Sequence, residues 1–363
     1  MTDAAAFRAQ FPVLGNRAFL NAGTEGPVPV AAAGAVRARV ERDVAEGRAG
    51  RAYFDTVMEL AASARAGYAE VLGAEPGEVA LTGATTDGLN TILGGLRFAP
   101  GDEILTSDEE HPGLLAPLRL ARLRHGLTVR MVPFDELVAA VGPTTRLIAC
   151  SHVSWVNGKL ADVAGLVATG VPVALDAAQA LGAIPVDVRA LGVDFYAGSG
   201  QKWLCGPEGS GCLYVRPDRL DDLEPPWPGY AALGGEVKEL DSPLAEGTGR
   251  LDNGFPSAIR SAWACASLDV LREAGWDWVH ERAAALAASF ATALADAGLE
   301  VAPRGPTTLV SWRAEEPEAE VARLAEAGFV IRSIPSSGLL RASVGAWNSE
   351  DELERLVAAA RSA

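Results

Sequence analysis

The chain has 363 residues, 49% of them hydrophobic, and a formal net charge of −16 at pH 7. This length suits a large domain plus a smaller one, and the charge disfavours nucleic acids and anionic membranes as partners, because phosphate groups require a basic surface. No apolar run resembles a signal peptide or could span a bilayer, so we expect a cytoplasmic protein without a membrane partner.

In the middle of the chain, short apolar runs alternate with segments of helical spacing, which is typical of a mainly parallel α/β sheet. The predicted strands are Val79–Thr82, Glu103–Thr106, Thr128–Val132, Arg146–Ser151, Val171–Asp176, Phe195–Ala197 and Gly211–Val215. The predicted helices between them are Thr86–Leu96, Pro112–His125 and Asp162–Val167. We expect a large α/β domain with a mainly parallel seven-stranded sheet flanked by helices.

After Pro217 the composition changes, and Leu223–Gly235 and Glu236–Arg250 are predicted to be loops. A second alternation follows. Its predicted helices are Ser257–Ala274, Trp276–Ala297, Pro317–Ala327 and Ser349–Ala360, and its strands lie near Leu309–Trp312, Phe329–Arg332 and Leu339–Ala342. We place a large domain at residues 15–254 and a smaller C-terminal α/β domain at 255–363, with residues 1–14 packing against the smaller one.

Cysteine and lysine usage limits the chemistry. The cysteines (Cys150, Cys205, Cys212 and Cys265) form no CxxC pair and no metal-ligand spacing with the histidines, so we expect unpaired thiols and no metal site. Lysine occurs only at positions 159, 202 and 238. Lys159 follows an Asn-Gly turn sequence and Lys238 lies among acids, which favours Lys202 for any function that requires a lysine.

Asp176 ends an apolar strand, at the edge where ligands of open α/β sheets bind. A buried acid there needs a cation or a hydrogen-bond donor, and the protonated pyridine nitrogen of pyridoxal 5′-phosphate (PLP) is such a partner. An aspartate that caps the following helix is an equally good interpretation.

Lys202 follows a strand that ends in small residues, and a glycine-rich loop comes directly after it. Small residues let backbone amides approach a phosphate, and Ser199 adds a hydroxyl. A lysine in a partly buried pocket has a lowered pKa and supplies the neutral amine that Schiff-base chemistry needs. A solvated lysine in a surface loop is the alternative.

The segment 81–90 opens from a strand through small residues and hydroxyls into a helix, whose N-terminus favours phosphate. An ordinary threonine N-cap would explain one hydroxyl but not both Thr85 and Thr86. The chain contains no GxxxxGK[ST] and no GxGxxG with a downstream ribose-binding acid, which disfavours a P-loop NTPase and a nicotinamide dehydrogenase.

The segments Asp176-Ala-Ala-Gln179 and Ser199-Gly-Gln-Lys202, in this order and spacing, resemble the class V aminotransferase and cysteine-desulfurase-like group of fold-type I PLP enzymes. The resemblance covers nearly the whole chain, from Phe19-Leu-Asn-Ala-Gly-Thr24 to Leu340–Asn348. It implies PLP as cofactor, an amino acid or related amine as small-molecule substrate, and a homodimer with the cofactor at the subunit boundary.

The resemblance also implies roles for individual residues. Lys202 would carry PLP as a Schiff base and move protons, Asp176 would pair with the pyridinium nitrogen, and His111 would stack on the ring. The other implied cofactor contacts are Ala178 beneath the ring, Gln179 at the phenolic oxygen, and Thr86, the Thr85 amide and Ser199 at the phosphate, with Gln201 where desulfurases often have His.

On the substrate side, the resemblance implies that Arg341 grips the carboxylate, as its bidentate fork suits. The loop 21–24, with Asn21 and Ala22, would border the substrate, and Trp155 replaces an Asn that contacts cofactor or substrate. A structural role is the alternative for both His111 and Arg341.

Two further departures bear on the reaction. Desulfurases carry a nucleophilic cysteine ahead of the substrate arginine, but Ile331–Arg341 contains none, which disfavours a persulfide-forming desulfurase. Phe255 stands where many relatives have a Thr that reaches a phosphate across the dimer, and Thr248 is nearby.

We therefore expect a PLP-dependent enzyme that acts through an external aldimine, with an aminotransferase-type reaction favoured. A C–S or other β-lyase is the alternative, because His111 points to that branch. An epimerase or a non-catalytic relative is the second alternative, although a non-catalytic relative would be expected to lose Lys202 or Asp176. No GxSxG elbow supports a hydrolase.

Overall fold

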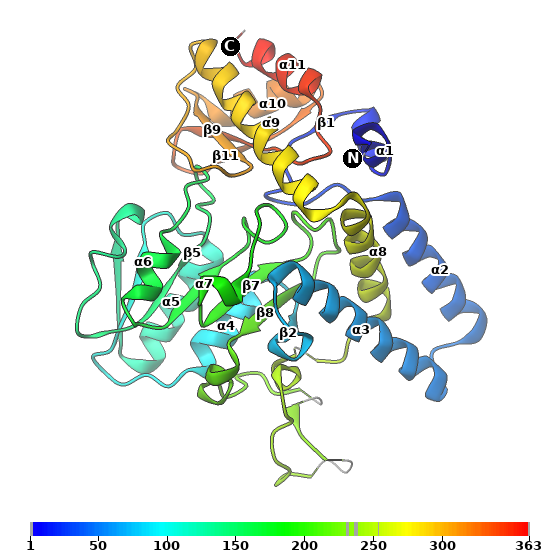
Figure 1. Cartoon of the computed structure of the whole chain (residues 1–363), viewed down its shortest axis with the longest axis vertical. Coiled ribbons are helices and arrows are strands. Elements are labelled where there is room, and N and C mark those ends of the chain that lie inside the picture. The colour runs from blue at the N-terminus through cyan, green and yellow to red at the C-terminus, as the bar shows by residue number, and fades with distance from the viewer. Residues whose placement is uncertain (1–2, 230–231, 236–238, 253, 362–363) are drawn as a thin grey trace.

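The computed structural model describes residues 3–229, 232–235, 239–252 and 254–361. Its centre is a seven-stranded sheet with the order β2-β8-β7-β6-β5-β3-β4 (Figure 1). The strands are β2 (Val79–Thr82), β3 (Glu103–Ser107), β4 (Thr128–Val132), β5 (Thr145–Ser151), β6 (Val173–Asp176), β7 (Phe195–Ser199) and β8 (Gly211–Val215). Strand β8 is antiparallel to β2 and β7, whereas the other pairs are parallel. The predicted α/β class with a mainly parallel sheet is confirmed.

Helices cover both faces of this sheet, because successive residues of each central strand point to opposite sides. In β5, Leu147 and Ala149 pack toward α4 (Thr85–Gly95) and α5 (Pro112–His125). Ile148 and Cys150 belong to the core on the other face, with residues of α3 (Gly50–Leu72), α6 (Val163–Ala168) and α7 (Val188–Leu191). The continuous apolar runs of the strands therefore reflect burial on both faces.

Several N-terminal elements were not among those predicted from the sequence: α1 (Ala4–Ala9), β1 (Ala18–Phe19), α2 (Val30–Glu46) and α3. Helix α2 buries Ala32 and Arg39, so its sequence lacks a wide apolar stripe. Both α2 and α3 pack against α8 (Ala258–Ala274) at one side of the molecule (Figure 1). Packing against α8, rather than a strong periodic signal, accounts for α2.

The C-terminal part contains a three-stranded antiparallel sheet, β11-β12-β9. Its elements are α9 (Trp276–Asp296), β9 (Leu309–Arg313), α10 (Pro317–Glu326), β10 (Phe329–Val330), β11 (Arg332–Ile334), β12 (Leu339–Ser343) and α11 (Glu350–Ala360). The single strand predicted near Phe329–Arg332 is wrong: β10 pairs with β1, whereas β11 pairs with β12. Residues 329–330 therefore belong to one sheet, and residues 332–334 belong to another.

The N-terminal segment contacts these C-terminal elements. Phe7 packs edge-on against Trp278, with ring centroids 5.3 Å apart, and Phe11 packs against Trp347. Arg8 forms an ion pair with the buried Glu352 of α11. The division into domains at 15–254 and 255–363, with residues 1–14 packing against the smaller domain, stays a prediction.

The remaining short elements are 3₁₀ helices: η1 (Pro12–Gly15), η2 (Pro76–Glu78), η3 (Phe134–Glu136), η4 (Pro217–Asp222) and η6 (Thr248–Leu251). The described residues between η4 and η6 project from the body (Figure 1), and a β-bridge joins Leu233 to Leu244. Lys238, one of the candidate lysines, lies outside the described residues. Within the described ranges, no helix is long and apolar enough to cross a membrane.

Candidate active site

A cavity of about 240 Å³ lies beyond the carboxyl ends of β2, β3, β5, β6 and β7. Ten of the residues predicted for the site line it: Thr85, Thr86, His111, Trp155, Asp176, Ala178, Gln179, Ser199, Gln201 and Lys202. Gly23, Thr24, Ala84 and Arg332 complete the lining. Asn21, Ala22 and Arg341 are not among the lining residues. Because the strands are parallel, their ends bring together residues that are far apart in the sequence.

Lys202 comes three residues after β7 and is partly accessible from the cavity. Burial of its amine lowers the pKa of Lys202 to about 8, against the opposing effect of the Asp176 charge, and the positive charges of Arg341 and Arg332 lower it further. A substantial fraction of the amine is therefore neutral near pH 8, which is the nucleophilic form.

Asp176 is the last residue of β6 and is buried. Its Oδ1 accepts a hydrogen bond from the Ala178 N–H at 2.8 Å, which fixes the direction of the carboxylate. The residues that follow form turns rather than a helix, so the helix-cap interpretation does not apply. Burial raises the pKa of Asp176, and the charge of Lys202 opposes this. A buried carboxylate of this kind needs a cationic or protonated partner.

The N-terminus of α4 faces the cavity with Ala84, Thr85 and Thr86. The Thr85 N–H donates to Ser199 Oγ at 3.0 Å, and the two hydroxyls are 2.7 Å apart. The Thr85 amide and the Ser199 hydroxyl are therefore bonded to each other at the start of α4, and their role at a phosphate stays a prediction. The helix dipole and the backbone amides at the N-terminus of α4, near Thr86, favour the binding of an anion at this end of the cavity.

The side-chain amides of Gln179 and Gln201 differ in their hydrogen-bond partners. Gln179 Nε2 donates to Gly23 O at 2.8 Å, and its Oε1 accepts from Trp203 Nε1. Gln201 Oε1 is buried and, among the described residues, has no hydrogen-bond partner. A buried acceptor without a partner costs free energy unless a ligand supplies a donor.

His111 caps the N-terminus of α5, since its Nδ1 accepts from the Gly113 N–H at 3.0 Å. Burial and the charges of Lys202, Arg332 and Arg341 lower the pKa of His111 to about 4, so the ring is neutral at pH 7 and its proton lies on Nε2. The ring meets Trp155 edge to face, with centroids 4.8 Å apart. The two aromatic side chains thus form one wall of the cavity.

Arg341 lies in β12 and is fully buried. Its Nη1 donates to Trp155 O at 2.5 Å, while Nε and Nη2 have no partner in the part of the chain that the structure describes. Gly23 packs against this guanidinium, because a Cβ at Gly23 would lie 2.7 Å from Nη2. Burial and the Arg332 charge lower the pKa of Arg341 to about 9.

Arg332 lines the cavity but has no counterpart among the predicted site residues. It pairs with Arg341 across β11 and β12, so both side chains leave the same face of this hairpin. Arg332 Nη1 donates to Thr24 Oγ1 at 3.2 Å, and its guanidinium lies 5.8 Å from the centroid of the Trp155 ring. Two like charges directly opposite each other are destabilising, which indicates a site for anionic groups. The pairing of β11 with β12 places Arg332 there, and no local sequence pattern marks it.

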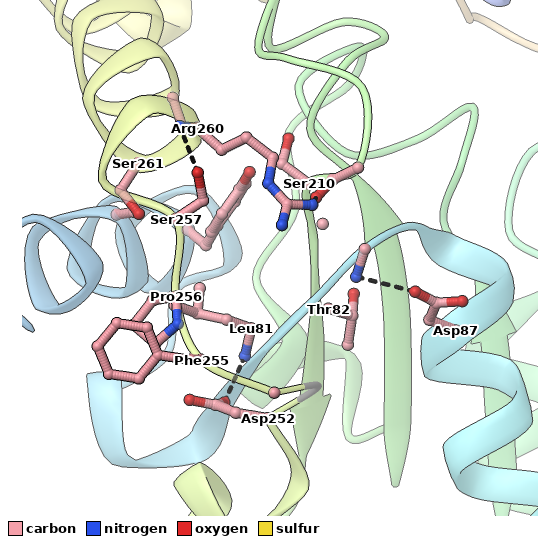
Figure 2. A pocket seen from close by; sticks show the side chains of 17 residues that line it. Leu81, Thr82, Asp87, Ser210, Asp252, Phe255, Pro256, Ser257, Arg260 and Ser261 are labelled. Carbon is pink, nitrogen blue, oxygen red and sulfur yellow. Dashed lines mark hydrogen bonds between the residues drawn. The ribbon is translucent and has the colours of Figure 1, made fainter. Parts of the chain in front are cut away.

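A second cavity, of about 210 Å³, lies beside the start of α4 (Figure 2). Thr82, Gly83 and Asp87 line it, whereas the residues between Gly83 and Asp87 line the first cavity. Phe255 borders it, is half exposed and packs edge-on against Phe54.

Thr248 is buried, and its hydroxyl donates to Gly77 O within the chain. This internal bond gives Thr248 a structural role in the single chain.

Lys159 and the cysteines are not among the residues that line the first cavity. Lys159 pairs with Asp135 and Glu109. Cys150, Cys205 and Cys212 are buried within the core, and none of the described cysteines lines the cavity. The described residues hold no group of three or more His, Cys, Asp or Glu arranged for a metal ion.

The sequence profile of the aminotransferase class-V family matches residues 45–356. A cysteine desulfurase from Cronobacter sakazakii is 30% identical over 321 residues, which cover 78% of this chain and 77% of the desulfurase. Isopenicillin N epimerase from Streptomyces clavuligerus is 36% identical over 225 residues, 57% of this chain and 55% of the epimerase. The chain thus spans little more than half the length of the epimerase.

Among solved structures, the cystine C–S lyase C-DES in complex with its reaction product, cysteine persulfide, has a TM-score of 0.92 and 28% identity, covering 97% of this chain and 99% of that one. A C-DES mutant with glycine covalently linked to the PLP cofactor has a TM-score of 0.93, with 28% identity and 98% of both chains covered.

Proposed function

We propose that this chain, which belongs to the aminotransferase class-V family, is a PLP-dependent lyase. The bond that it cleaves is the Cβ–S bond of an amino-acid substrate. The observation that carries this proposal is the arginine pair of the hairpin beside the cavity, in which Arg332 lines the cavity and Arg341 is buried behind Gly23. Two guanidinium groups, Arg332 and Arg341, belong to the adjoining hairpin, and the described cavity residues include no thiol that could act as a persulfide carrier.

The residues around the cavity fit PLP. Lys202 offers an amine whose pKa of about 8 makes the neutral form accessible, and Asp176 offers a buried carboxylate for the ring nitrogen. Thr86 and Ser199 lie at the N-terminal end of α4, where a phosphate is favoured. Gln201 Oε1 lacks a hydrogen-bond partner among the described residues. These residues, with His111, Ala178 and Gln179 near the ring, would hold the cofactor.

When bound, PLP supplies an electron sink for the electron pair released at Cα of an amino acid. The protein's own groups would then do the rest. Asp176 would keep the proton on the pyridine nitrogen, because its buried carboxylate favours a cationic partner. The Lys202 amine would remove the proton from Cα and return one later, and neutral His111 would cover one face and donate from Nε2.

The substrate class follows from the two arginines. Arg341 has two buried donor atoms without partners among the described residues, which suits an α-carboxylate. Arg332 faces the cavity from the opposite residue of the hairpin and suits a second, distal carboxylate. Cystine carries both carboxylates and a Cβ–S bond, and the structurally similar C-DES is a cystine C–S lyase.

An aminotransferase-type reaction, favoured in the sequence, and an epimerisation need the same cavity groups, and a relative is an isopenicillin N epimerase. Product analysis separates these reactions. The homodimer and the cytoplasmic location are parts of the same proposal. Exposed apolar side chains on α2 and α3, among them Val40, Val44, Phe54 and Met58, support a subunit contact on that side.

The test starts with the purified protein loaded with PLP. Borohydride reduction followed by peptide mapping is expected to place the pyridoxyl group on Lys202, and Lys202→Ala is expected to remove it. Incubation with cystine should consume one water and release pyruvate, ammonia and cysteine persulfide, which leaves with the electron pair of the Cβ–S bond, while the visible cofactor band is retained. Conversion to pyridoxamine phosphate with a keto acid would instead establish transamination, and appearance of the D-isomer would establish epimerisation. A pyridoxyl group on another lysine would overturn the site assignment.

A further inference from the structure

Glu110 is a buried carboxylate that lies next to the cavity without lining it. It is 4% exposed and directly precedes His111 in the chain. It accepts hydrogen bonds from the hydroxyls of Ser107 and Ser151, the latter at 2.6 Å, and from the Ser151 N–H at 2.9 Å. This buried carboxylate accepts three hydrogen bonds from residues at the ends of β3 and β5, and it thereby links the ends of these two strands.

The Ser151 N–H needs this partner because of the sheet geometry. The N–H of His152 donates to Asp176 O on the β6 side of β5. Backbone N–H groups alternate in direction along a strand, so the N–H of Ser151 points to the β3 side. The β3–β5 register runs through Leu105 and Ile148, and the chain of β3 then turns away after Ser107. Glu110 takes the place of the missing strand and satisfies a buried donor.

Two residues of the proposed cofactor site depend on this position. Ser151 is the register partner of Asp176 across β5 and β6, so the end of β5 supports the residue that would meet the ring nitrogen. His111 is joined to Glu110 by a peptide bond and begins α5. The Glu110 carboxylate is therefore held in a fixed position relative to Asp176, which would meet the ring nitrogen, and to His111, which would cover the face of the ring.

We propose that Glu110 is a positioning residue that fixes the ends of β3 and β5, and through them Asp176 and His111, for PLP. This inference rests on the proposed function to the extent that the cavity binds PLP. It requires neither cystine nor β-elimination. Asp176 on β6 and the Cys150 thiol on β5 are titratable groups close to Glu110, and burial with the Asp176 charge raises the pKa of Glu110 to about 7.

The test compares PLP affinity, measured by absorbance titration of the apoprotein, in Glu110→Ala and Glu110→Gln. Glu110→Ala is expected to raise the PLP dissociation constant by about tenfold or more, because the Ser151 N–H loses its partner. Glu110→Gln is expected to restore most of the affinity, since its amide oxygen can accept from that N–H while its amide nitrogen donates to a serine hydroxyl. The circular dichroism of the bound cofactor should change in the alanine variant and recover in the glutamine variant.

Glu103 provides a matched control. It is also a buried acid that joins β3 to β5, through Thr145 Oγ1 at 2.7 Å, but at the far end of the sheet. Glu103→Gln is expected to change the melting temperature of the apoprotein and leave the PLP dissociation constant within about twofold.

A merely structural Glu110 would behave as Glu103 does, with a lowered melting temperature, unchanged PLP affinity and unchanged cofactor dichroism, and that result would overturn the proposal. If Glu110→Ala fails to fold, Ser151→Ala removes one donor to Glu110 and must weaken PLP binding in the same direction; unchanged affinity there would also overturn it. Wild-type protein that binds PLP without releasing pyruvate would refute the lyase proposal alone, whereas wild-type protein that binds no PLP would refute both.

Discussion

Arg332 is expected to decide which substrates the cavity accepts. The change Arg332→Gln removes the guanidinium that faces the cavity and leaves Arg341 in place. A hydrogen-bonded charge pair is worth about 1.5–3 kcal/mol, and the partial exposure of Arg332 places it toward the lower end, at about 1.5–2 kcal/mol. This corresponds to a loss of about 10- to 30-fold in kcat/KM for a substrate with a distal carboxylate.

The assay compares two substrates under identical conditions, following pyruvate release. Cystine has a distal carboxylate and S-methylcysteine has none, so Arg332→Gln should lower kcat/KM for cystine and leave S-methylcysteine within about twofold. Thr24→Ala is the control, because it removes the hydrogen bond to Arg332 but keeps the charge. An equal loss for both substrates, or none for cystine, would refute the assignment of Arg332 to the distal carboxylate.

Four other outcomes are expected. Gly23→Ala should raise KM for the α-carboxylate substrate at least several-fold, because its Cβ would lie 2.7 Å from Arg341 Nη2; steady-state kinetics check this. The rate of PLP incorporation into the apoprotein, followed by stopped-flow absorbance, should rise between pH 6.5 and 9, since the Lys202 amine loses its proton near a pKa of about 8; a flat profile would contradict that value. Asp252→Asn should lower the free energy of unfolding by about 1–3 kcal/mol, because Asp252 accepts from Arg65 and from the Leu81 N–H; denaturant titration measures this. Phe54→Asp should convert the proposed dimer to a monomer in light scattering, and an unchanged mass would place the subunit contact elsewhere.

Most of the strands of the sheet, and the PLP cofactor, could be predicted from the sequence. Asp176 and Lys202 stand at the ends of apolar runs, and a charged residue in that setting is visible without coordinates. The family, the PLP cofactor and the class of PLP-dependent enzyme are confirmed by the family match and by the similarity to a PLP-containing structure. The roles of individual residues stay predictions, and so does the choice among transamination, elimination and epimerisation.

The parts that the sequence could not predict depend on long-range pairing. Arg332 is placed opposite Arg341 by the register of a hairpin, and no local pattern marks that residue. Glu110 acquires its partners because β3 and β5 separate at their ends, which periodicity does not reveal. The buried position of Arg341 behind Gly23, and the hydrogen bond that occupies the Thr85 amide, follow from tertiary packing.

The parallel pairing of β1 with β10 has a consequence for synthesis of the protein. Residues 18–19 are synthesised about 310 residues before their partners at 329–330. The β1–β10 pair, and the contacts of Phe7 and Arg8 with α9 and α11, therefore form only after the long intervening chain has been synthesised. Contacts of such high sequence separation fold slowly. Until they form, the C-terminal hairpin that carries both arginines lacks its N-terminal support, which makes this step a point at which chaperones or proteases can act on the nascent enzyme.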